Sequence, residues 1–254
     1  MNYFSPKNTA ERYAKGRPFF HRNTIKHIRD FIKIDYKLEN ALDAACGTGM
    51  SASALLDIAE NVFGIDTSDE MLKLALNPKD IKYSKASAED LPFENNYFDL
   101  ITVSSGVHWF DIDKFLSEAK RVLKTNGRLV LYENHFISEM HGVESFGNWF
   151  PNVYLKKFPS PKRNNSYLWN NDNLKSKGFV FIGEEKFKNS VEFTKEQLIL
   201  YFTTQSNITA AVENKLSNYE EIESWLDKEL TPFFSVQRRT INFGNWIKYL
   251  QKIN

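Results

Sequence analysis

The sequence predicts an α/β fold: a doubly wound, mostly parallel Rossmann-like sheet with an antiparallel C-terminal strand, together with a helical lid. Two observations predict the sheet. Short apolar segments alternate with helical patterns over the first half of the chain, and a glycine-rich turn separates the first apolar segment from the helix after it. Alternation at this spacing produces right-handed βαβ units, with helices on both faces of a parallel sheet. In such sheets ligands bind beyond the carboxyl ends of the strands.

The first half of the chain supplies the parallel strands and the helices between them. One helix is expected at 51–59, Ser68 can cap a second, and Asp111 or Asp113 can open a third. The tripeptide Thr-Asn-Gly at 125–127 predicts a turn. The expected strands lie at 41–45, 61–65, 81–84, 98–104 and 128–132.

The sequence pattern of the second half changes from about Glu133 onward. Residues 195–230 have helical patterns, and two strand-like stretches, 180–193 and 233–246, bracket them. We interpret these stretches as late strands that close the sheet, and the helical segments as a lid over its active end. The chain is therefore expected to form a single domain, 1–254, with a helical cover at 1–35, a ligand-binding core at 36–135, a lid with a late strand at 136–230 and a closing strand at 231–254.

Composition argues against several classes of protein. Lys and Arg number 33 against 32 Asp and Glu, so no strong field draws the chain to nucleic acid or to a membrane surface. The single cysteine, Cys46, rules out an intrachain disulfide and makes a structural zinc site improbable. The N-terminal residues lack an apolar stretch long enough for a signal peptide, and no run of about 18 apolar residues occurs. We expect a cytoplasmic protein without a metal, a nucleic-acid partner or a membrane partner.

The stretch 43–52, which reads DAACGTGMSA, carries the strongest functional signal. Gly47 and Gly49 let the backbone approach a ligand without a Cβ clash, and the N-terminus of the following helix offers free N–H groups. Asp66 comes nineteen residues after Gly47, at the end of the second expected strand, where a carboxylate can accept hydrogen bonds from both hydroxyls of a ribose. Loop and acid together predict a site for an adenosine-containing ligand. A turn that merely needs glycine is the competing interpretation.

Asp43 helps to separate two kinds of adenosine ligand. Dinucleotide-binding loops usually keep the strand apolar up to the first glycine, whereas this strand ends with an acid four residues before Gly47. An acid at this position suits a ligand with a cationic portion, or a loop held by side-chain hydrogen bonds. It fits a pyrophosphate poorly.

Taken together, the motifs resemble those of the class I S-adenosylmethionine-dependent methyltransferases, in particular the methyltransferase type 11 group. The resemblance covers about residues 8–135. The stretches that carry it are DAACGTG at 43–49 (glycine motif), VFGIDTS at 62–68 (acidic strand), SAEDLPF at 87–93 with YFDL at 97–100 (adenine contact) and RVLKTNGRLVL at 121–131 (entry to the fifth strand).

A finer similarity is to the trans-aconitate methyltransferase-like branch of that family. YAKGRP at 13–18 and VHWFD at 107–111 are similar to segments of that branch. So is the C-terminal pattern formed by Phe193-Thr194, Tyr201 and 204–206.

The resemblance implies S-adenosyl-L-methionine as cofactor, with S-adenosyl-L-homocysteine as product. It implies that Tyr13 and Arg17 fold over the cofactor and that Arg17 pairs with its carboxylate; a solvated N-terminal helix is the alternative. Ser87 stands where the family often has Asp or Asn, so adenine recognition leans on backbone near Ala88 and on Glu89. The implied cofactor-binding residues are Arg17, Asp43, Ala45, Cys46, Gly47, Gly49, Asp66, Thr67, Met71, Ser87, Ala88, Glu89, Ser104, Ser105 and Trp109, and the candidate substrate residues are Tyr13, Trp109 and Trp149.

Methyl transfer asks little acid–base chemistry of the protein, because a methyl group on a sulfonium is already electrophilic and mainly needs an aligned nucleophile. A carboxylate acceptor needs no base, whereas a phenol or an amine benefits from one. His108, just past the fourth expected strand, is the candidate catalytic base, and a structural or cofactor-facing histidine is the competing interpretation. Trp109 is interpreted as a wall of the cofactor or substrate pocket.

The favoured function is methylation of a small molecule, with O-methylation of a carboxylic acid preferred within it. An NAD(P)-dependent Rossmann oxidoreductase is one alternative, which Asp66 allows and Asp43 disfavours. A non-catalytic cofactor-binding protein is another, because fold alone does not establish activity. A monomer or weak homodimer is expected. The acceptor, the need for a base and the pathway stay open.

Overall fold

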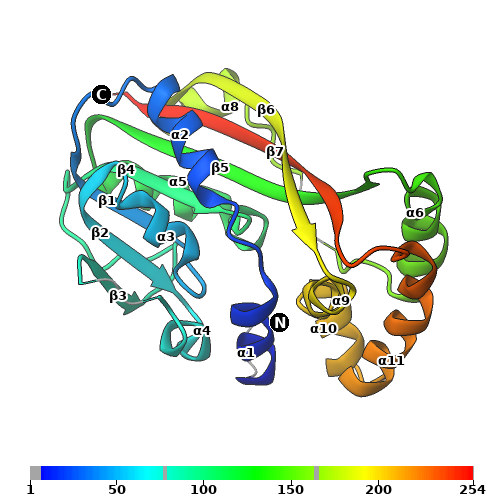
Figure 1. Ribbon diagram of the computed structural model, residues 1–254. Helices are drawn as coiled ribbons and strands as arrows, with labels where there is room; N and C mark the ends of the chain where they lie inside the picture. The colour runs from blue at the N-terminus through cyan, green and yellow to red at the C-terminus, as the bar shows by residue number, and fades with distance from the viewer. Residues whose placement is uncertain (1–6, 77–78, 163–165, 254) are drawn as a thin grey trace. The chain divides into compact units, whose positions relative to one another are not determined.

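The computed structural model describes residues 7–76, 79–162 and 166–253. One seven-stranded sheet runs through it in the order β3-β2-β1-β4-β5-β7-β6 (Figure 1). β1 pairs in parallel with β2 and β4, β2 pairs with β3, and β4 pairs with β5, while the C-terminal strands run antiparallel. This mixed sheet with flanking helices confirms the predicted fold class. The strands are β1 (Leu38–Ala44), β2 (Ala59–Asp66), β3 (Ile81–Lys85), β4 (Phe98–Ser104), β5 (Leu123–Met140), β6 (Phe179–Phe193) and β7 (Arg239–Lys252).

The chain divides into two compact units. The long strands β5, β6 and β7 each contribute residues to both of them. Unit 1 comprises Met1–Pro18, His135–Lys162 and Lys188–Gly244, and unit 2 comprises Phe19–Asn134, Arg163–Phe187 and Asn245–Asn254.

Unit 2 carries a hydrophobic layer on each face of its part of the sheet, because successive strand residues point to opposite faces. Ala41 and Leu100 pack in one buried cluster, and their chain neighbours Leu42 and Ile101 pack in the other. The first cluster includes residues of α2 (His21–Phe31) and α3 (Met50–Leu55), and the second includes residues of α5 (Ile112–Val122). Helices on both faces hold the parallel strands in place, so their carboxyl ends form one fixed edge. The remaining helices of unit 2 are α4 (Asp69–Lys73), the 3₁₀ turn η1 (Val107–Trp109) and α8 (Asn171–Lys175).

Two helix starts of unit 2 confirm the caps expected from sequence. The Ser68 hydroxyl accepts a hydrogen bond from the Met71 amide at the start of α4. The Asp111 carboxylate accepts one from the Lys114 amide at the start of α5. These side chains satisfy amide donors that have no partner within the first helical turn.

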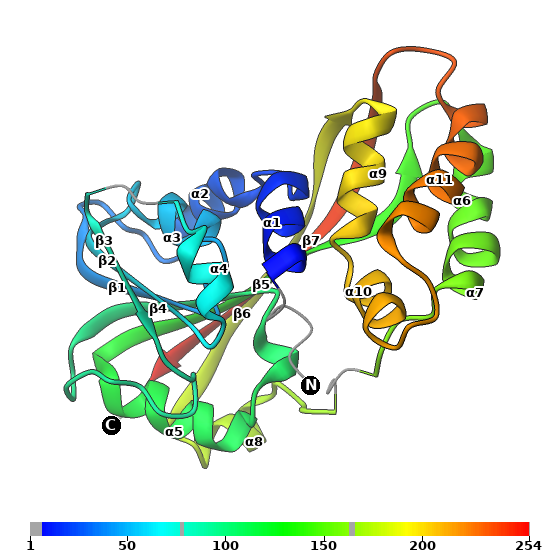
Figure 2. The same cartoon turned by 90° about the horizontal axis from the view of Figure 1, so that it is seen from below.

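Unit 1 consists of helices and of the adjoining parts of β5, β6 and β7 (Figure 2), and aromatic side chains form its core. Within it, α9 packs against α1, α10 and α11. Phe202 lies at the centre of the core, where its ring meets those of Trp149, Phe150 and Tyr154. The helices are α1 (Lys7–Gly16), α6 (Glu144–Trp149), the π-helical turn η2 (Phe150–Tyr154), α7 (Leu155–Lys157), α9 (Lys195–Thr203), α10 (Ser206–Glu213), α11 (Tyr219–Leu230) and the 3₁₀ turn η3 (Thr231–Phe233).

Three local expectations were wrong. The turn at 125–127 is a bulge inside the continuous strand β5, where Asn126 takes a left-handed φ of 61° and the β4–β5 register shifts. The closing strand begins at Arg239 rather than 233, because Pro232 lies in the turn η3. The helix expected at 51–59 is α3, which ends at Leu55 because strand β2 already begins at Ala59.

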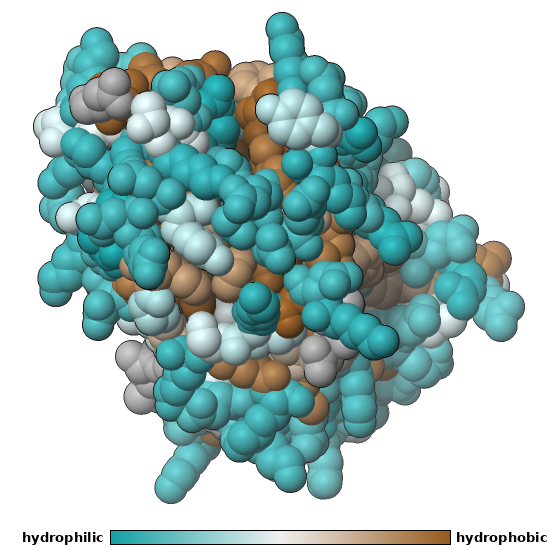
Figure 3. Space-filling view, turned by 90° about the vertical axis from the view of Figure 1, so that its left-hand side faces the viewer, coloured by the Kyte–Doolittle hydropathy of each residue, from teal (hydrophilic) through white to brown (hydrophobic). Residues whose placement is uncertain are grey.

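No helix among the described residues is long and apolar enough to cross a membrane. The face of the molecule drawn in Figure 3 is mostly hydrophilic, with apolar residues in small groups between polar ones.

Candidate functional site

The glycine-rich loop joins β1 to α3 at the carboxyl edge of the parallel strands in unit 2. Three of its residues take left-handed backbone conformations: Ala45 (φ 58°), Gly47 (φ 54°) and Gly49 (φ 76°). Such a conformation costs a residue with a Cβ about 1 kcal/mol, so Ala45 persists only because the surrounding loop holds it. The loop therefore curls tightly, with its backbone near the N-terminus of α3.

Asp43 is buried beneath this loop and ties three elements together. Its carboxylate accepts a hydrogen bond from the Ser51 hydroxyl at the start of α3, and another from the Thr102 hydroxyl on β4 (3.1 Å). Burial raises the pKa of Asp43 to about 7, and the hydrogen bonds from Ser51 and Thr102 oppose that rise. Of the two interpretations of this acid, a loop held by side-chain hydrogen bonds has direct support in the geometry.

Asp66, at the end of β2, holds the loop from its other side. One carboxylate oxygen accepts from the Gly47 amide (2.9 Å) and the other from the Ser68 amide (2.9 Å). Burial raises the pKa of Asp66, while these backbone hydrogen bonds act against the rise. Each oxygen keeps lone-pair capacity, so the carboxylate can accept further hydrogen bonds from a ligand.

The two loop glycines have different surroundings. A Cβ built on Gly47 would meet nothing within 4 Å, so the loop has open space at that point. A Cβ on Gly49 would lie 2.2 Å from the Tyr83 hydroxyl, which donates to the Leu76 carbonyl. Gly49 is thus required by the packing of Tyr83, whereas Gly47 leaves room for a ligand. Beside them, the Thr48 hydroxyl is buried and has no hydrogen-bond partner among the described residues.

Ser87 and Glu89 form a small hydrogen-bonded turn after β3. The Ser87 hydroxyl donates to the Glu89 carboxylate and accepts from the Glu89 amide (3.3 Å). The other Glu89 carboxylate oxygen accepts from the Asp111 amide (2.9 Å) just before α5. Because its proton is committed to Glu89, the Ser87 hydroxyl can offer a ligand only its acceptor capacity, and Ala88 between the two residues is buried.

Several predicted site residues lie at the end of β4 and in the turn that follows it. Ser105 has a left-handed φ of 54°, and its amide donates to the Tyr132 carbonyl (2.9 Å). His108 and Trp109 form the turn η1 that follows, with ring centres 4.6 Å apart. His108 is buried, whereas Trp109 is 38% exposed, which suits a pocket wall better than a core position.

The other predicted residues of unit 2 lie in or next to the elements already described. Ala45 and Cys46 lie in the loop itself, Thr67 directly follows Asp66, Met71 is buried in α4 and Ser104 ends β4.

Sequence reasoning missed a histidine–tyrosine pair at this edge. His21 Nδ1 lies 3.0 Å from the Tyr132 hydroxyl, and Tyr132 neighbours Ser105 through its carbonyl. Burial lowers the pKa of His21 to about 4, so the imidazole is neutral near pH 7. No local signal could reveal the pair, because its two members are 111 positions apart.

Three predicted residues, Tyr13, Arg17 and Trp149, belong to unit 1. The Arg17 guanidinium lies 4.8 Å from the Tyr13 ring. Trp149 is buried, and its indole N–H donates to Glu229 (2.9 Å). Their assignments to cofactor or substrate stay predictions.

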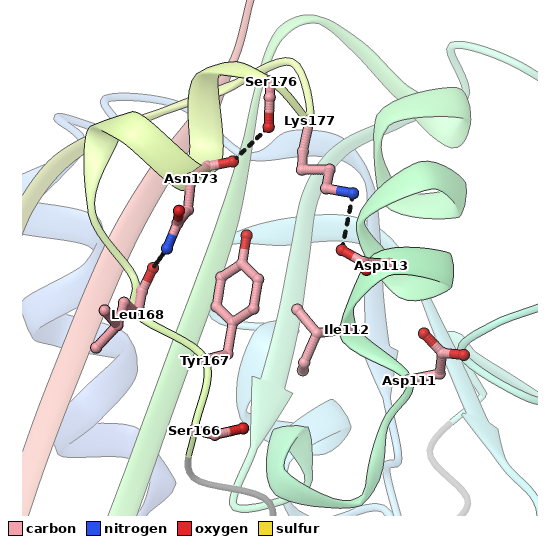
Figure 4. Close-up of a pocket in the computed structure, with 9 residues that line it drawn as sticks. All are labelled: Asp111, Ile112, Asp113, Ser166, Tyr167, Leu168, Asn173, Ser176 and Lys177. Carbon is pink, nitrogen blue, oxygen red and sulfur yellow. Dashed lines mark hydrogen bonds and ion pairs between the residues drawn. The ribbon is translucent and has the colours of Figure 1, made fainter.

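A separate cavity of about 530 Å³ lies in unit 2 between the start of α5 and the segment around α8 (Figure 4). Lys177 and Asp113 form an ion pair at its rim (2.8 Å), and the Tyr167 hydroxyl has no hydrogen-bond partner in the part of the chain that the structure describes. None of the predicted site residues lines it. One of its lining residues, Asp111, donates its amide N–H to the carboxylate of Glu89 in the predicted site.

Comparison with known proteins identifies the segment that contains this site. Residues 42–131 match the family described as a methyltransferase domain. A protein of Dictyostelium discoideum named as a methyltransferase is 28% identical over 155 residues, covering 56% of this chain and 58% of that protein. A demethylmenaquinone methyltransferase of Thermotoga maritima is 41% identical over 99 residues, covering 37% of this chain and 43% of that protein. The chain thus matches about half the length of these relatives.

The fold has a counterpart among solved structures. The structure of a type II methyltransferase from Anaeromyxobacter dehalogenans superimposes with a TM-score of 0.71, covering 93% of this chain and 97% of that chain at 17% identity. At this identity the likeness concerns the fold alone. It extends over both units, whereas the family match is confined to residues 42–131 in unit 2.

Proposed function

We propose that this chain is a class I S-adenosylmethionine-dependent methyltransferase, that it transfers a methyl group to a small molecule and that it prefers a carboxylic acid as acceptor. The observation that carries the proposal is the pairing of Asp66 with the Gly47 amide beside open loop space. It supports the proposal because a carboxylate that could accept from ribose hydroxyls lies next to backbone that a ligand can approach.

The residues present fit S-adenosylmethionine. Asp66 would hold the ribose hydroxyls, and the Ser87 oxygen would accept from the adenine amino group. The Thr48 hydroxyl, which has no partner among the described residues, is available to a polar group of the ligand. When bound, the cofactor supplies an electrophilic methyl group on a sulfonium. A pyrophosphate would fit this loop poorly, because the buried acid Asp43 lies directly beneath it.

The chain's own contribution to catalysis is binding and orientation. The loop, fixed from below by Asp43 and from the side by Asp66, holds its shape before the ligand arrives, so little ordering is needed on binding. A carboxylate acceptor carries its own nucleophilic oxygen and needs no proton removed. With a carboxylate acceptor, His108, which is buried against Trp109, would serve only to position groups in the pocket. With an acceptor that has an ionisable O–H or N–H, His108 would act as the base.

Calorimetric titration of the purified protein with S-adenosylhomocysteine tests the cofactor, with NAD as a parallel control. We expect micromolar binding of S-adenosylhomocysteine and none of NAD. Binding of NAD alone would replace the proposal with an oxidoreductase. Binding of neither would leave the chain without the cofactor on which the proposal rests.

Incubation with methyl-labelled S-adenosylmethionine and matched panels of carboxylic acids, phenols and amines tests the acceptor class. We expect labelled methyl esters from the acid panel. Label in the phenol or amine panel alone would disprove the preference for acids. In that case the His108→Ala variant should also lose activity, because those acceptors gain from a base.

A further inference from the structure

The cavity between the start of α5 and the segment around α8 lies wholly in unit 2. Its volume of about 530 Å³ is within the range of pockets that hold small organic molecules. The start of α5 forms one wall, and the segment from Ser166 to Lys177 forms the other (Figure 4). Ile112, Leu168 and the Tyr167 ring contribute apolar surface, and the remaining lining residues are polar. Such a mixed lining recognises a ligand by both shape and hydrogen bonding.

The Tyr167 side chain is fixed in this cavity, and its hydroxyl is unused. Its ring packs against the large hydrophobic cluster of unit 2, with its centre 4.7 Å from that of the Trp169 ring. The hydroxyl points into the cavity between α8 and α5 (Figure 4), and its oxygen is buried without a hydrogen-bond partner among the described residues. Burial raises the pKa of this hydroxyl and the charge of Asp113 adds to the rise, so it stays protonated near pH 7. A buried polar atom that the chain leaves unpaired marks a place for a ligand or for ordered water.

Three other side chains of the cavity already donate to the chain itself. The Asn173 amide group donates to the Leu168 carbonyl (3.0 Å), and the Ser176 hydroxyl donates to the Asn173 carbonyl (2.9 Å). The Lys177 ammonium forms the ion pair with Asp113. Within the described part of the chain, what these groups leave for a ligand is mainly acceptor capacity: the side-chain oxygens of Asn173 and Ser176 and the second carboxylate oxygen of Asp113.

The charge of the lining favours a cation over an anion. Asp111 and Asp113 supply two carboxylates and Lys177 supplies one ammonium group, so the lining carries one net negative charge. Asp111 is also contacted by Lys114, which does not line the cavity (3.4 Å), so Asp113 is the main anionic group available to a ligand. The Asp113 side chain is 68% exposed, and ion pairs this exposed contribute little. A ligand cation can therefore share Asp113 with Lys177, whereas an anion would meet two carboxylates.

We infer that this cavity binds a small organic amine, with the ammonium group held by the Tyr167 hydroxyl and the Asp113 carboxylate. An ammonium group has three donors and no acceptor, which complements the acceptors that the cavity leaves unused. The apolar part of the amine would lie against Ile112 and Leu168. The inference goes beyond the proposed methyl transfer and does not depend on it, because none of the predicted site residues lines the cavity.

The test is calorimetric titration of the full chain with phenethylamine and butylamine, with phenethyl alcohol as neutral control and phenylacetate as anionic control. We expect saturable binding of at least one amine, with a Kd of about 1 mM or tighter, and at least about tenfold weaker binding of both controls. Absence of saturable binding of both amines, or equal binding of phenethyl alcohol and phenethylamine, overturns the inference.

Variants of the lining locate the ammonium group. Asp113→Asn should weaken amine binding about tenfold, because a charge-assisted hydrogen bond is lost. Tyr167→Phe keeps the ring and loses only the hydroxyl, and should weaken binding about threefold to fivefold. Asp227→Asn is the matched control, since it removes an exposed carboxylate that pairs with Lys195 in unit 1, and should change the affinity less than twofold. Equal amine affinity in Asp113→Asn, Tyr167→Phe and the unmodified protein would place the amine elsewhere and overturn the inference.

A titration with saturating S-adenosylhomocysteine separates this site from the cofactor site. We expect the amines to bind with S-adenosylhomocysteine in place, and their displacement by it would overturn the inference. Amine binding that depends on Asp113 in a protein that does not bind S-adenosylhomocysteine would keep the amine site and remove the proposed function. Binding of S-adenosylhomocysteine without binding of either amine would remove the amine site and leave the proposed function standing.

Discussion

The two units use their buried polar groups in contrasting ways. In unit 2, Asp43 and Asp66 accept hydrogen bonds from the glycine loop and its neighbours, so the acids complete the backbone around a ligand site. In unit 1, the Arg17 guanidinium lies beside the Tyr13 and Tyr201 rings, and its Nε has no hydrogen-bond partner among the described residues. The contrast is in what fixes each place: carboxylates fix the loop of unit 2, whereas two aromatic rings and one backbone carbonyl hold the Arg17 side chain in unit 1.

The largest expected effect is on the pH dependence of stability, through Asp43. Its pKa is raised to about 7 in the folded protein, so folding favours the protonated acid, and this contribution is lost as the pH rises from about 4 towards 7. Asp43→Asn cannot ionise and should lack that loss. We expect the unfolding free energy of the variant, relative to the unmodified protein, to increase by about 3 kcal/mol between pH 5 and pH 8. Urea denaturation at the two pH values measures it, and an equal difference at both would show that Asp43 does not titrate in this range.

The next effect concerns the ribose contacts of Asp66. Asp66→Ala removes the proposed acceptor for two hydroxyls and releases the Gly47 and Ser68 amides. We expect about a 100-fold loss of S-adenosylhomocysteine affinity, corresponding to about 2.7 kcal/mol. Asp69→Ala, which removes a nearby exposed acid paired with Lys85, should change the affinity less than twofold. Unchanged affinity in folded Asp66→Ala would move the ligand away from this loop.

Substitution of the two loop glycines should separate an effect on protein stability from an effect on ligand affinity. Gly49→Ala forces Tyr83 to move and should cost about 2 to 3 kcal/mol of unfolding free energy. Gly47→Ala meets no neighbour, so only its left-handed φ costs stability, about 1 kcal/mol. Its methyl group instead projects into the open loop space and should weaken S-adenosylhomocysteine binding about tenfold. Equal thermal denaturation of the two variants would contradict the different surroundings that the structure gives them.

The same contrast explains what could be predicted from sequence. The loop elements lie within a few residues of each other or at a fixed spacing, so 43–52 and Asp66 indicated a ligand site without a structure. The partner of Asp43 on β4, Thr102, was not predictable, because parallel register brings it there across 59 positions. Unit 1 was even less accessible to sequence reasoning. Arg17 meets Thr204 across 187 positions, and no local pattern encodes that contact.

The smallest effect distinguishes packing from binding in unit 1. Trp149 lies in the aromatic core and donates to Glu229, although the sequence predicted a substrate residue. Trp149→Phe keeps an aromatic ring but loses the hydrogen bond and some volume, so we expect a loss of about 1 to 2 kcal/mol of unfolding free energy. S-adenosylhomocysteine affinity and the KM for the acceptor should stay the same. A raised KM with unchanged stability would reverse the interpretation: Trp149 would then contact the acceptor, and the aromatic core of unit 1 would serve binding as well as packing.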